Sequence, residues 1–439
     1  MKKIVMSAVA LTAIMSAPTA LSAEDGINIL DDLVFDAQIR PRYEMADVKN
    51  NDKTTANAYT VRTKLNVTGK LFNVDGLTAS VGIISVNNFG SDKYNSTDNG
   101  QTQYDIVKDP QKAMISNAEV NYTVDKTTLH AGRGQVNLDN QRFIGTVGWR
   151  QFERSYDSIF VANNSVENLS VLAAWVYGLQ GVGAADTMNA NTALLHAAYK
   201  IDDALTVTAY DYMIAADLTP GAGNGGYGFD TYGIALTGKL AMSGVKLNYR
   251  AEYAVQDDAT MKYQSSATNA DNFKANADYY NLDLGANISG ILAGVNYEVL
   301  SGASTDATSK DTAFNPMLGT NHKFNGWADV FYVAATPQSG LQDLNFRLGY
   351  KAKGFGKLLA VYHDFTADTK VYGDINGNPS DDFGSEIDVV YTNKIPGVKN
   401  LSGLLKYADY SKGAITEFGG AAHDKQVFWA QLDYKFSTK

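Results

Sequence analysis

Histidines are the first side chains to examine for catalysis, because a nucleophile or an activated water needs a base and an orienting group within reach. The chain has five of them, at His130, His196, His322, His363 and His423. His363 has an adjacent acid, Asp364, but successive residues of a strand point to opposite faces. The sequence therefore does not predict an enzyme.

Two short motifs could bind a metal or a cofactor. The run Asp374–Asn378 resembles the start of a calcium loop, yet Pro379 stands where that loop needs glycine and Ser385 where it needs glutamate. The glycine-rich run Gly221–Gly228 lacks the Lys-Ser/Thr pair of a phosphate-binding loop. We expect a polar loop tip at the first motif, and neither a cofactor nor a metal.

Charged side chains instead recur at every second position. Arg40 and Arg42 alternate with Ile39, Pro41 and Tyr43. The same alternation places Arg62 and Lys64 on the polar face of the next segment, and it continues to the C-terminus. A period of two predicts strands with one polar and one apolar face.

The alternating segments run for about 10–12 residues, longer than most soluble strands and long enough to cross the apolar band of an outer membrane. Connections alternate between short and long, as in membrane barrels with short periplasmic turns and long extracellular loops. A first count gives 19 segments, including 326–335, but single-chain barrels have an even number. We therefore place 301–340 in one external excursion.

The prediction is an all-β, transmembrane, antiparallel up-and-down barrel of about 18 strands. The expected strands are 34–45, 57–69, 76–87, 113–124, 127–134, 155–162, 167–178, 191–200, 204–214, 229–239, 244–254, 278–287, 290–300, 341–351, 355–365, 383–392, 400–410 and 425–436.

The N-terminus resembles a secretory signal peptide. Lys2 and Lys3 precede an apolar run too short to span a membrane, and Ala23 suits a signal peptidase. We expect cleavage after residue 23 and a barrel domain over residues 24–439. Losing two lysines changes the formal charge from -10 to -12. This acidic balance argues against a nucleic-acid partner.

A barrel of this size leaves an aqueous lumen unless loops fill it. Its first two strands contribute a basic wall, made of Arg40, Arg42, Arg62 and Lys64. Later strands contribute an acidic wall, made of Asp283, Glu298, Glu386 and Asp388, and the same polar faces carry Arg250 and Arg347. A basic wall facing an acidic wall would orient charged solutes. The alternative is that neighbouring acids simply neutralise the arginines.

A second candidate site is the segment 132–157, which is dense in Arg, Asp, Gln and Gly. Its charges could line an inward fold, or they could form a solvated surface loop.

The run DNQRFIGTVGWRQFERSYD in this segment resembles the alginate-export-like porins, a family related to the substrate-specific outer-membrane porins of proteobacteria. The stretches RPRYE, YTVRTKLNVTG and HKFNGWADVF agree with it. The resemblance implies an 18-stranded pore for small hydrophilic solutes, with this segment at the constriction. It implies that six residues lie near the pore: Arg133, Asp139, Asn140, Arg142, Arg150 and Gln151.

The expected function is a porin for passive diffusion of small hydrophilic, charged solutes. The alternatives are a dedicated transporter of anionic saccharides and a plugged structural or adhesive barrel. The implied location is the bacterial outer membrane. The implied partners are its lipids, the transported solutes and the barrel-assembly machinery, with a homotrimer as one assembly to test.

Overall fold

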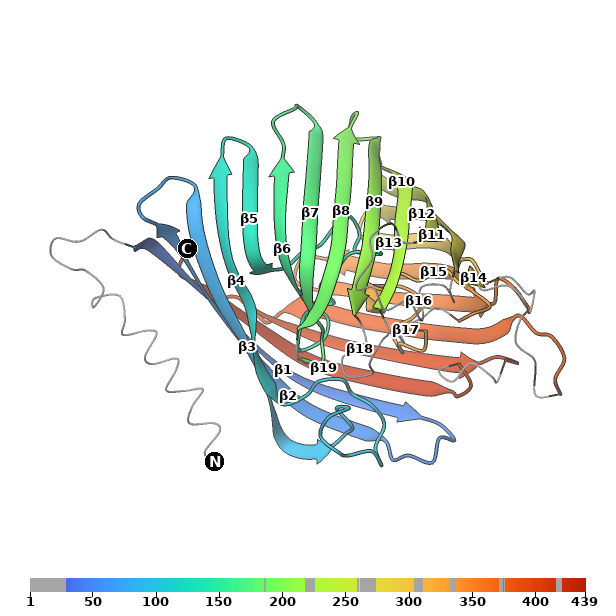
Figure 1. Ribbon diagram of the computed structural model, residues 1–439. Helices are drawn as coiled ribbons and strands as arrows, with labels where there is room; N and C mark the ends of the chain where they lie inside the picture. Colours follow the sequence, from blue (N-terminus) through green and yellow to red (C-terminus); the bar gives the residue numbers. More distant parts are fainter. Residues whose placement is uncertain are drawn as a thin grey trace.

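The computed structural model of the chain describes residues 29–184, 187–217, 226–258, 260, 274–303, 311–331, 337–370, 374, 376–415 and 421–439. The predicted signal peptide and part of the run Gly221–Gly228 lie outside the described residues. Strands dominate the part that is described (Figure 1). None of its helices is long and apolar enough to cross a membrane.

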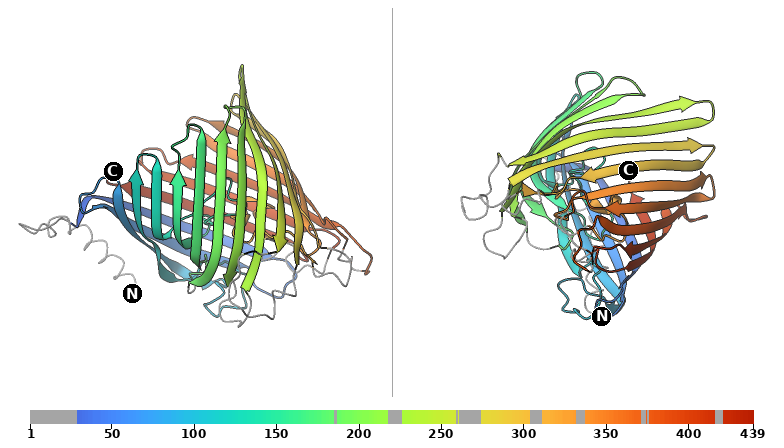
Figure 2. Two further views of the ribbon diagram at one scale, coloured as in Figure 1. Left: turned by 45° about the horizontal axis from the view of Figure 1, so that its top comes forward. Right: turned by 90° about the vertical axis from the view of Figure 1, so that its right-hand side faces the viewer.

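Eighteen long strands form one antiparallel sheet that closes on itself, which confirms the predicted fold (Figures 1 and 2). The last strand pairs with the first, with Ala37 opposite Phe436 and Tyr43 opposite Ala430. The strands are β1 Leu30–Val48, β2 Ala56–Leu71, β3 Leu77–Lys93, β4 Lys112–Val124, β5 Thr127–Gly134, β6 Ser155–Asn163, β7 Leu169–Gln180, β8 Met188–Lys200, β9 Thr206–Asp217, β10 Gly226–Met242, β11 Val245–Asp258, β12 Lys274–Ile288, β13 Ile291–Leu300, β15 Leu341–Ala352, β16 Gly356–Thr366, β17 Asp382–Lys394, β18 Leu401–Lys412 and β19 Lys425–Ser437.

The connection between β13 and β15 decides the strand count. It contains the two-residue strand β14, Asp311–Thr312, which pairs in parallel with the start of β12, and the short helix η2, Asn321–Lys323. Residues 326–331, the described part of the segment 326–335, form turns rather than a strand. The even count expected from parity is therefore confirmed. All connections of two to six residues then fall at one end of the barrel, the short-turn end, and the longer ones at the other, the long-loop end.

The two faces of each strand differ as the alternation predicts. On β15, Phe346 and Leu348 point outward and are 52% and 63% exposed, while Asn345, directly before them, points inward and is buried. Outward aromatic rings gather at both ends of the wall. Tyr43 and Tyr59 pack near the long-loop end, with ring centroids 4.7 Å apart and planes tilted by 33°. At the short-turn end Phe355 packs on Tyr391, with centroids 5.6 Å apart. Paired aromatic girdles of this kind are typical of membrane barrels.

An apolar core occupies the inside of the barrel toward the long-loop end. Phe143 and Phe314, from two different connections, pack on each other and on Tyr279 of β12. The sequence predicts a polar lumen throughout. The structure differs here, because long connections turn inward and carry apolar side chains that need burial away from water.

Candidate functional site

Two segments from distant parts of the chain fold into the barrel. We call residues 135–154 the first inward segment and residues 311–331 the second inward segment. They contact each other through backbone hydrogen bonds, among them Gly145 N–H to Leu318 C=O (2.9 Å) and Thr320 N–H to Gln141 C=O (2.9 Å). The open question of whether the first segment is a surface loop is settled: it lies inside the barrel.

The first inward segment reaches the wall at β13 through Arg142. Its guanidinium is 1% exposed and pairs with Glu298 of β13 at 2.8 Å. It also donates to Asn325 of the second inward segment at 2.9 Å and lies over the ring of Phe324. Arg142 therefore connects three elements at once. Its distance in sequence from Glu298 explains why no local pattern could reveal the pair.

The other end of the first inward segment lies against β1 and β2. Arg150 pairs with Glu44 of β1 at 2.9 Å, and Gln151 donates its side-chain amide to the hydroxyl of Thr60 on β2 at 2.9 Å. Glu44 and two further acids, Asp109 and Asp329, raise the pKa of Arg150 against the opposing effect of its burial. The guanidinium is thus held permanently charged at this contact.

The tip of the first inward segment touches the far wall. Asp139 pairs with Arg250 of β11 at 2.6 Å, and the Lys323 ammonium donates to the Asn140 carbonyl at 3.0 Å. Asp139 and Gln141 both adopt positive φ, at 51° and 68°, and so turn the chain back toward the core. Five of the six residues implied by the resemblance thus lie inside the barrel.

Arg133 is the exception and corrects that expectation. It shares a strand face with Leu129 and Ala131, and Ala131 stands opposite Ile159, whose side chain is 51% exposed. Arg133 therefore points outward, where it pairs with Asp157 at 2.6 Å. The resemblance implies that the Arg133 side chain lies near the pore, whereas the alternation along its strand places this side chain on the outer face.

The predicted basic wall is present but neutralised. Arg40 pairs with Asp433 of β19 at 3.1 Å, and Arg62 and Lys64 both pair with Glu153 of the first inward segment. Burial opposes ionisation of Glu153, but the two cations outweigh it and hold the pKa of Glu153 below its usual range. Neutralisation of the basic residues by nearby acids is the alternative that the sequence left open.

Arg42 completes this neutralised wall. Its guanidinium is buried, donates to the Trp149 carbonyl and lies 3.7 Å from Glu44 and 3.8 Å from Asp109. Arg42 and Arg62 are 1% and 2% exposed, so neither faces open water. Arg40 and Lys64 keep partial exposure, with 12% and 22% of their side chains accessible.

The predicted acidic wall is also engaged. Glu386 and Asp388 of β17 accept the backbone N–H groups of Ala328 (2.7 Å) and Trp327 (3.1 Å) in the second inward segment. Gly326 has a positive φ of 83°, which turns these two N–H groups toward the wall.

Asp283 of β12 instead pairs with Arg347 of β15 at 2.6 Å. The guanidinium lies across the intervening strand β13 at Gly294, where an added Cβ would stand 2.8 Å from its Nη2. The missing side chain of Gly294 therefore lets this pair form, and 29% of the Arg347 side chain stays accessible to water.

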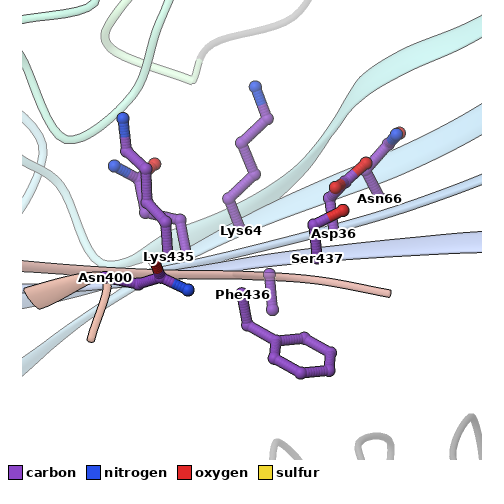
Figure 3. Close-up of a pocket in the computed structure, with 9 residues that line it drawn as sticks. Asp36, Lys64, Asn66, Asn400, Lys435, Phe436 and Ser437 are labelled. Atoms are coloured by element: carbon purple, nitrogen blue, oxygen red, sulfur yellow. The ribbon is translucent and has the colours of Figure 1, made fainter. Parts of the chain in front are cut away.

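A cavity of about 390 Å³ opens on the inner wall near the C-terminal end of β19. Asp36, Lys64 and Asn66 line it from one side of the sheet, while the Phe436 ring lies on the other side (Figure 3). The cavity joins charged residues with amides, so this part of the lumen offers both charges and hydrogen bonds to a hydrophilic solute.

Sequence analysis missed the residue that joins both inward segments to the wall. Lys406 of β18 is 6% exposed and donates to Nε2 of His322 at 2.6 Å, while Nδ1 of His322 donates to Asp329 at 2.7 Å. Burial, only partly offset by Asp329, lowers the pKa of His322 to about 4. Burial opposes ionisation of Asp329, but His322 and Arg150 outweigh it and lower the pKa of Asp329 to about 2. Both charge states follow from tertiary contacts.

Groups of three or more His, Cys, Asp or Glu side chains that could hold a metal are absent from the described residues. The carboxylate of Asp374, in the calcium-like run, accepts the backbone N–H groups of Asn376 and Asn378 at 2.8 Å each. This carboxylate thus stabilises a turn at the tip of its loop.

The fold is that of solved outer-membrane barrels. Acinetobacter baumannii OccAB4 matches with a TM-score of 0.67 and 14% identity over 93% of this chain and 99% of that one. Pseudomonas aeruginosa OccK8 (OprE) matches with a TM-score of 0.66 and 13% identity over 93% and 99% of the two chains. The outer membrane protein OpdK of P. aeruginosa, also solved with vanillate, matches with a TM-score of 0.64 over 92% and 99%.

These neighbours are substrate-specific outer-membrane porins, and they do not support the resemblance to alginate-export-like porins in particular. At this level of identity they establish the fold. No protein-family model matches the sequence, and no curated protein matches it.

Proposed function

We propose that the chain is an outer-membrane porin in which two inward segments narrow the lumen and select small hydrophilic, charged solutes for passive diffusion. The observation that carries the proposal is the first inward segment, which crosses the lumen from Glu44 on β1 to Arg250 on β11. A barrel of 18 strands is wide enough for an aqueous channel. A segment that crosses it leaves only a constricted path.

The residues that we assign to the wall of this path are those that are partly accessible inside the barrel. Arg40, Lys64, Arg250 and Arg347 supply positive charge, and Asp139, Asp283 and Asp433 supply negative charge. Each charge has a partner of opposite sign close by. We therefore expect weak ion selectivity with strong dependence on the shape and hydrogen bonding of the solute.

Conductance of the refolded protein in a planar lipid bilayer tests the proposal. We expect a steady, ohmic current through single channels. Neutralising two of the four accessible cations, Arg40→Gln with Lys64→Gln, shifts the reversal potential in a salt gradient toward cations. Arg133→Gln on the outer face is the matched control and leaves it unchanged. Absence of current at any voltage would overturn the porin assignment.

That outcome would favour the plugged structural or adhesive barrel, the second candidate. The observation on its side is the apolar core around Phe143 and Phe314, which fills part of the interior. A dedicated transporter of anionic saccharides is the third candidate. It predicts current that such a sugar blocks at low concentration, and the paired state of the basic residues argues against it.

The proposal also places the protein in the outer membrane after removal of residues 1–23, with the barrel over residues 24–439. N-terminal sequencing of the protein from isolated outer membranes tests both statements. Lipids and the barrel-assembly machinery are the partners that this location implies. The homotrimer stays a proposal, which the mass of the detergent-solubilised protein tests.

A further inference from the structure

Three of the four tryptophans of the chain surround one lysine ammonium group. The Nζ atom of Lys406 lies 4.2 Å from the ring centre of Trp149, 3.9 Å from that of Trp327 and 5.1 Å from that of Trp429. A cation over the face of a tryptophan is attracted by the negative face of the ring, most strongly where water is excluded. We call these three rings the tryptophan cage.

The members of the cage come from different parts of the molecule. Trp149 belongs to the first inward segment, Trp327 to the second, and Trp429 to β19, where it stands opposite Lys406 in the strand register. His322, also from the second segment, stacks on Trp149 with centroids 4.7 Å apart and planes 8° apart. Both inward segments and the wall therefore meet at one ammonium group.

The buried ammonium group of Lys406 is stable only in contact with these partners. Lys406 is buried, and a buried cation without partners is costly. Its hydrogen bond to His322 and its three ring contacts replace water, while Asp388 of β17 and Asp329, on the far side of His322, supply the balancing charge. If either inward segment moved away, Lys406 would lose a ring or its hydrogen bond. Its position on the wall therefore favours the arrangement in which both segments are docked.

We propose that Lys406 is the positioning residue of the constriction: its ammonium occupies the tryptophan cage and holds both inward segments against the wall, in place of an external organic ammonium ion. Only the expected effect of Lys406 on the current rests on the proposed function. The cage itself is a site for an alkylammonium group, and in the native chain the side chain of Lys406 fills it.

Removal of the ammonium tests this role. Lys406→Met keeps the length and the apolar stem of the side chain but removes its charge, Lys406→Arg keeps a cation that stacks on aromatic rings, and Lys406→Ala empties the cage. We expect Lys406→Met and Lys406→Ala to raise the population of undocked states about tenfold, since a desolvated cation–π contact is worth at least that factor. Lys406→Arg should restore most of the docking. Lys435→Met, on the inner face of β19, is the matched control.

Chemical rescue separates a specific role from a general loss of packing. Propylammonium added to Lys406→Ala, which lacks three carbons and the ammonium, should restore native behaviour, while the same concentration of potassium should not. The native protein should not respond to propylammonium, because the tethered lysine already occupies the site. The shift in gel migration on heating shows whether each variant forms a folded barrel. If a Lys406 variant does not fold, Trp327→Phe takes its place, because it keeps a ring but weakens the cage.

Two readouts distinguish this inference from the porin assignment. The fourth tryptophan, Trp175, lies on the outer face and is 47% exposed. In a Trp175→Phe background, all three remaining tryptophans therefore belong to the cage. Fluorescence then reports docking even if no current flows. Bilayer current reports the constriction, with frequent openings of larger conductance expected for Lys406→Met. Native fluorescence and native current in Lys406→Met, or no effect of propylammonium on Lys406→Ala, would overturn the inference.

Discussion

The two inward segments lie side by side in the lumen but are attached to the wall in different ways. The first is attached by its own charged side chains, as in the pairs of Arg142 with Glu298 and of Arg150 with Glu44. The second is attached at His322 and Asn325 by side chains and also by its backbone, because wall carboxylates such as Glu386 accept its N–H groups. The residues that determine a side-chain attachment lie in the segment itself, whereas those that determine a backbone attachment lie in the wall.

The largest expected effect comes from breaking a side-chain attachment. Arg142→Met leaves Glu298 buried without its partner, and breaking a buried pair in this way costs about 3–5 kcal/mol. We expect the first inward segment to be released, with a larger and less steady single-channel current. Arg347→Met, at a pair whose two members are both partly accessible, is the control and should cost about 1 kcal/mol or less. Equal effects of the two variants would contradict the role given to burial.

A change in the wall should release the second segment with a smaller effect. Glu386→Leu removes the acceptor of the Ala328 N–H, and an unsatisfied buried donor costs about 1–3 kcal/mol. Glu386→Gln keeps an acceptor oxygen and should have the milder effect. Protease cleavage within residues 311–331 measures the release. Lys323 is exposed and contacts the first segment but not the wall, so Lys323→Ala should leave cleavage unchanged. A strong effect there would show that the contact between the two segments holds this one in place as well.

Acid should loosen the contact between the two segments. The pKa of His322 is about 4 when docked, against an ordinary value of 6.5, so the released state binds more protons between these values. The contribution of neutral His322 is complete above pH 6.5 and is lost as the pH falls through 4. A titration of cage fluorescence should show this midpoint, and His322→Gln should abolish it. A midpoint that persists in His322→Gln would assign the effect to another group.

The smallest effect is expected at the accessible pairs. Arg347→Gln removes a charge whose partner, Asp283, remains nearby and partly hydrated. We expect a small shift of the reversal potential toward cations and no change in thermal stability beyond about 0.5 kcal/mol. A large loss of stability would mean that the pair braces the wall across Gly294 rather than lining the path.

Sequence alone predicts the wall well because the wall is periodic. The alternation of residues such as Phe346, Arg347 and Leu348 sets the face of every strand, and the parity of short and long connections sets the strand number. The same rule, applied to Arg133 with Leu129 and Ala131, places Arg133 outside. The resemblance placed it near the pore because a match of sequence stretches carries no information about strand faces.

The inward segments could not be predicted in the same way. Their partners are remote in sequence, as with Arg142 and Glu298 or Lys406 and His322. Composition marks the first segment as charged, but charge alone suits a solvated loop equally well. For the second segment, the tryptophans of the chain were the available signal. A polar protein with four tryptophans, one of them at Trp327 in a long connection, has a reason to bury that ring.

The path of the first inward segment also has a mechanical consequence. A closed sheet one strand thick flattens easily, because bending across the strands breaks no hydrogen bond. The segment joins β1 through Arg150 to β11 through Asp139, on nearly opposite sides of the ring. It therefore acts as a cross-tie that resists both flattening and widening of the cylinder. Under lateral pressure, the cross-section of the barrel is thus maintained by the inward segment as well as by the strands of the wall.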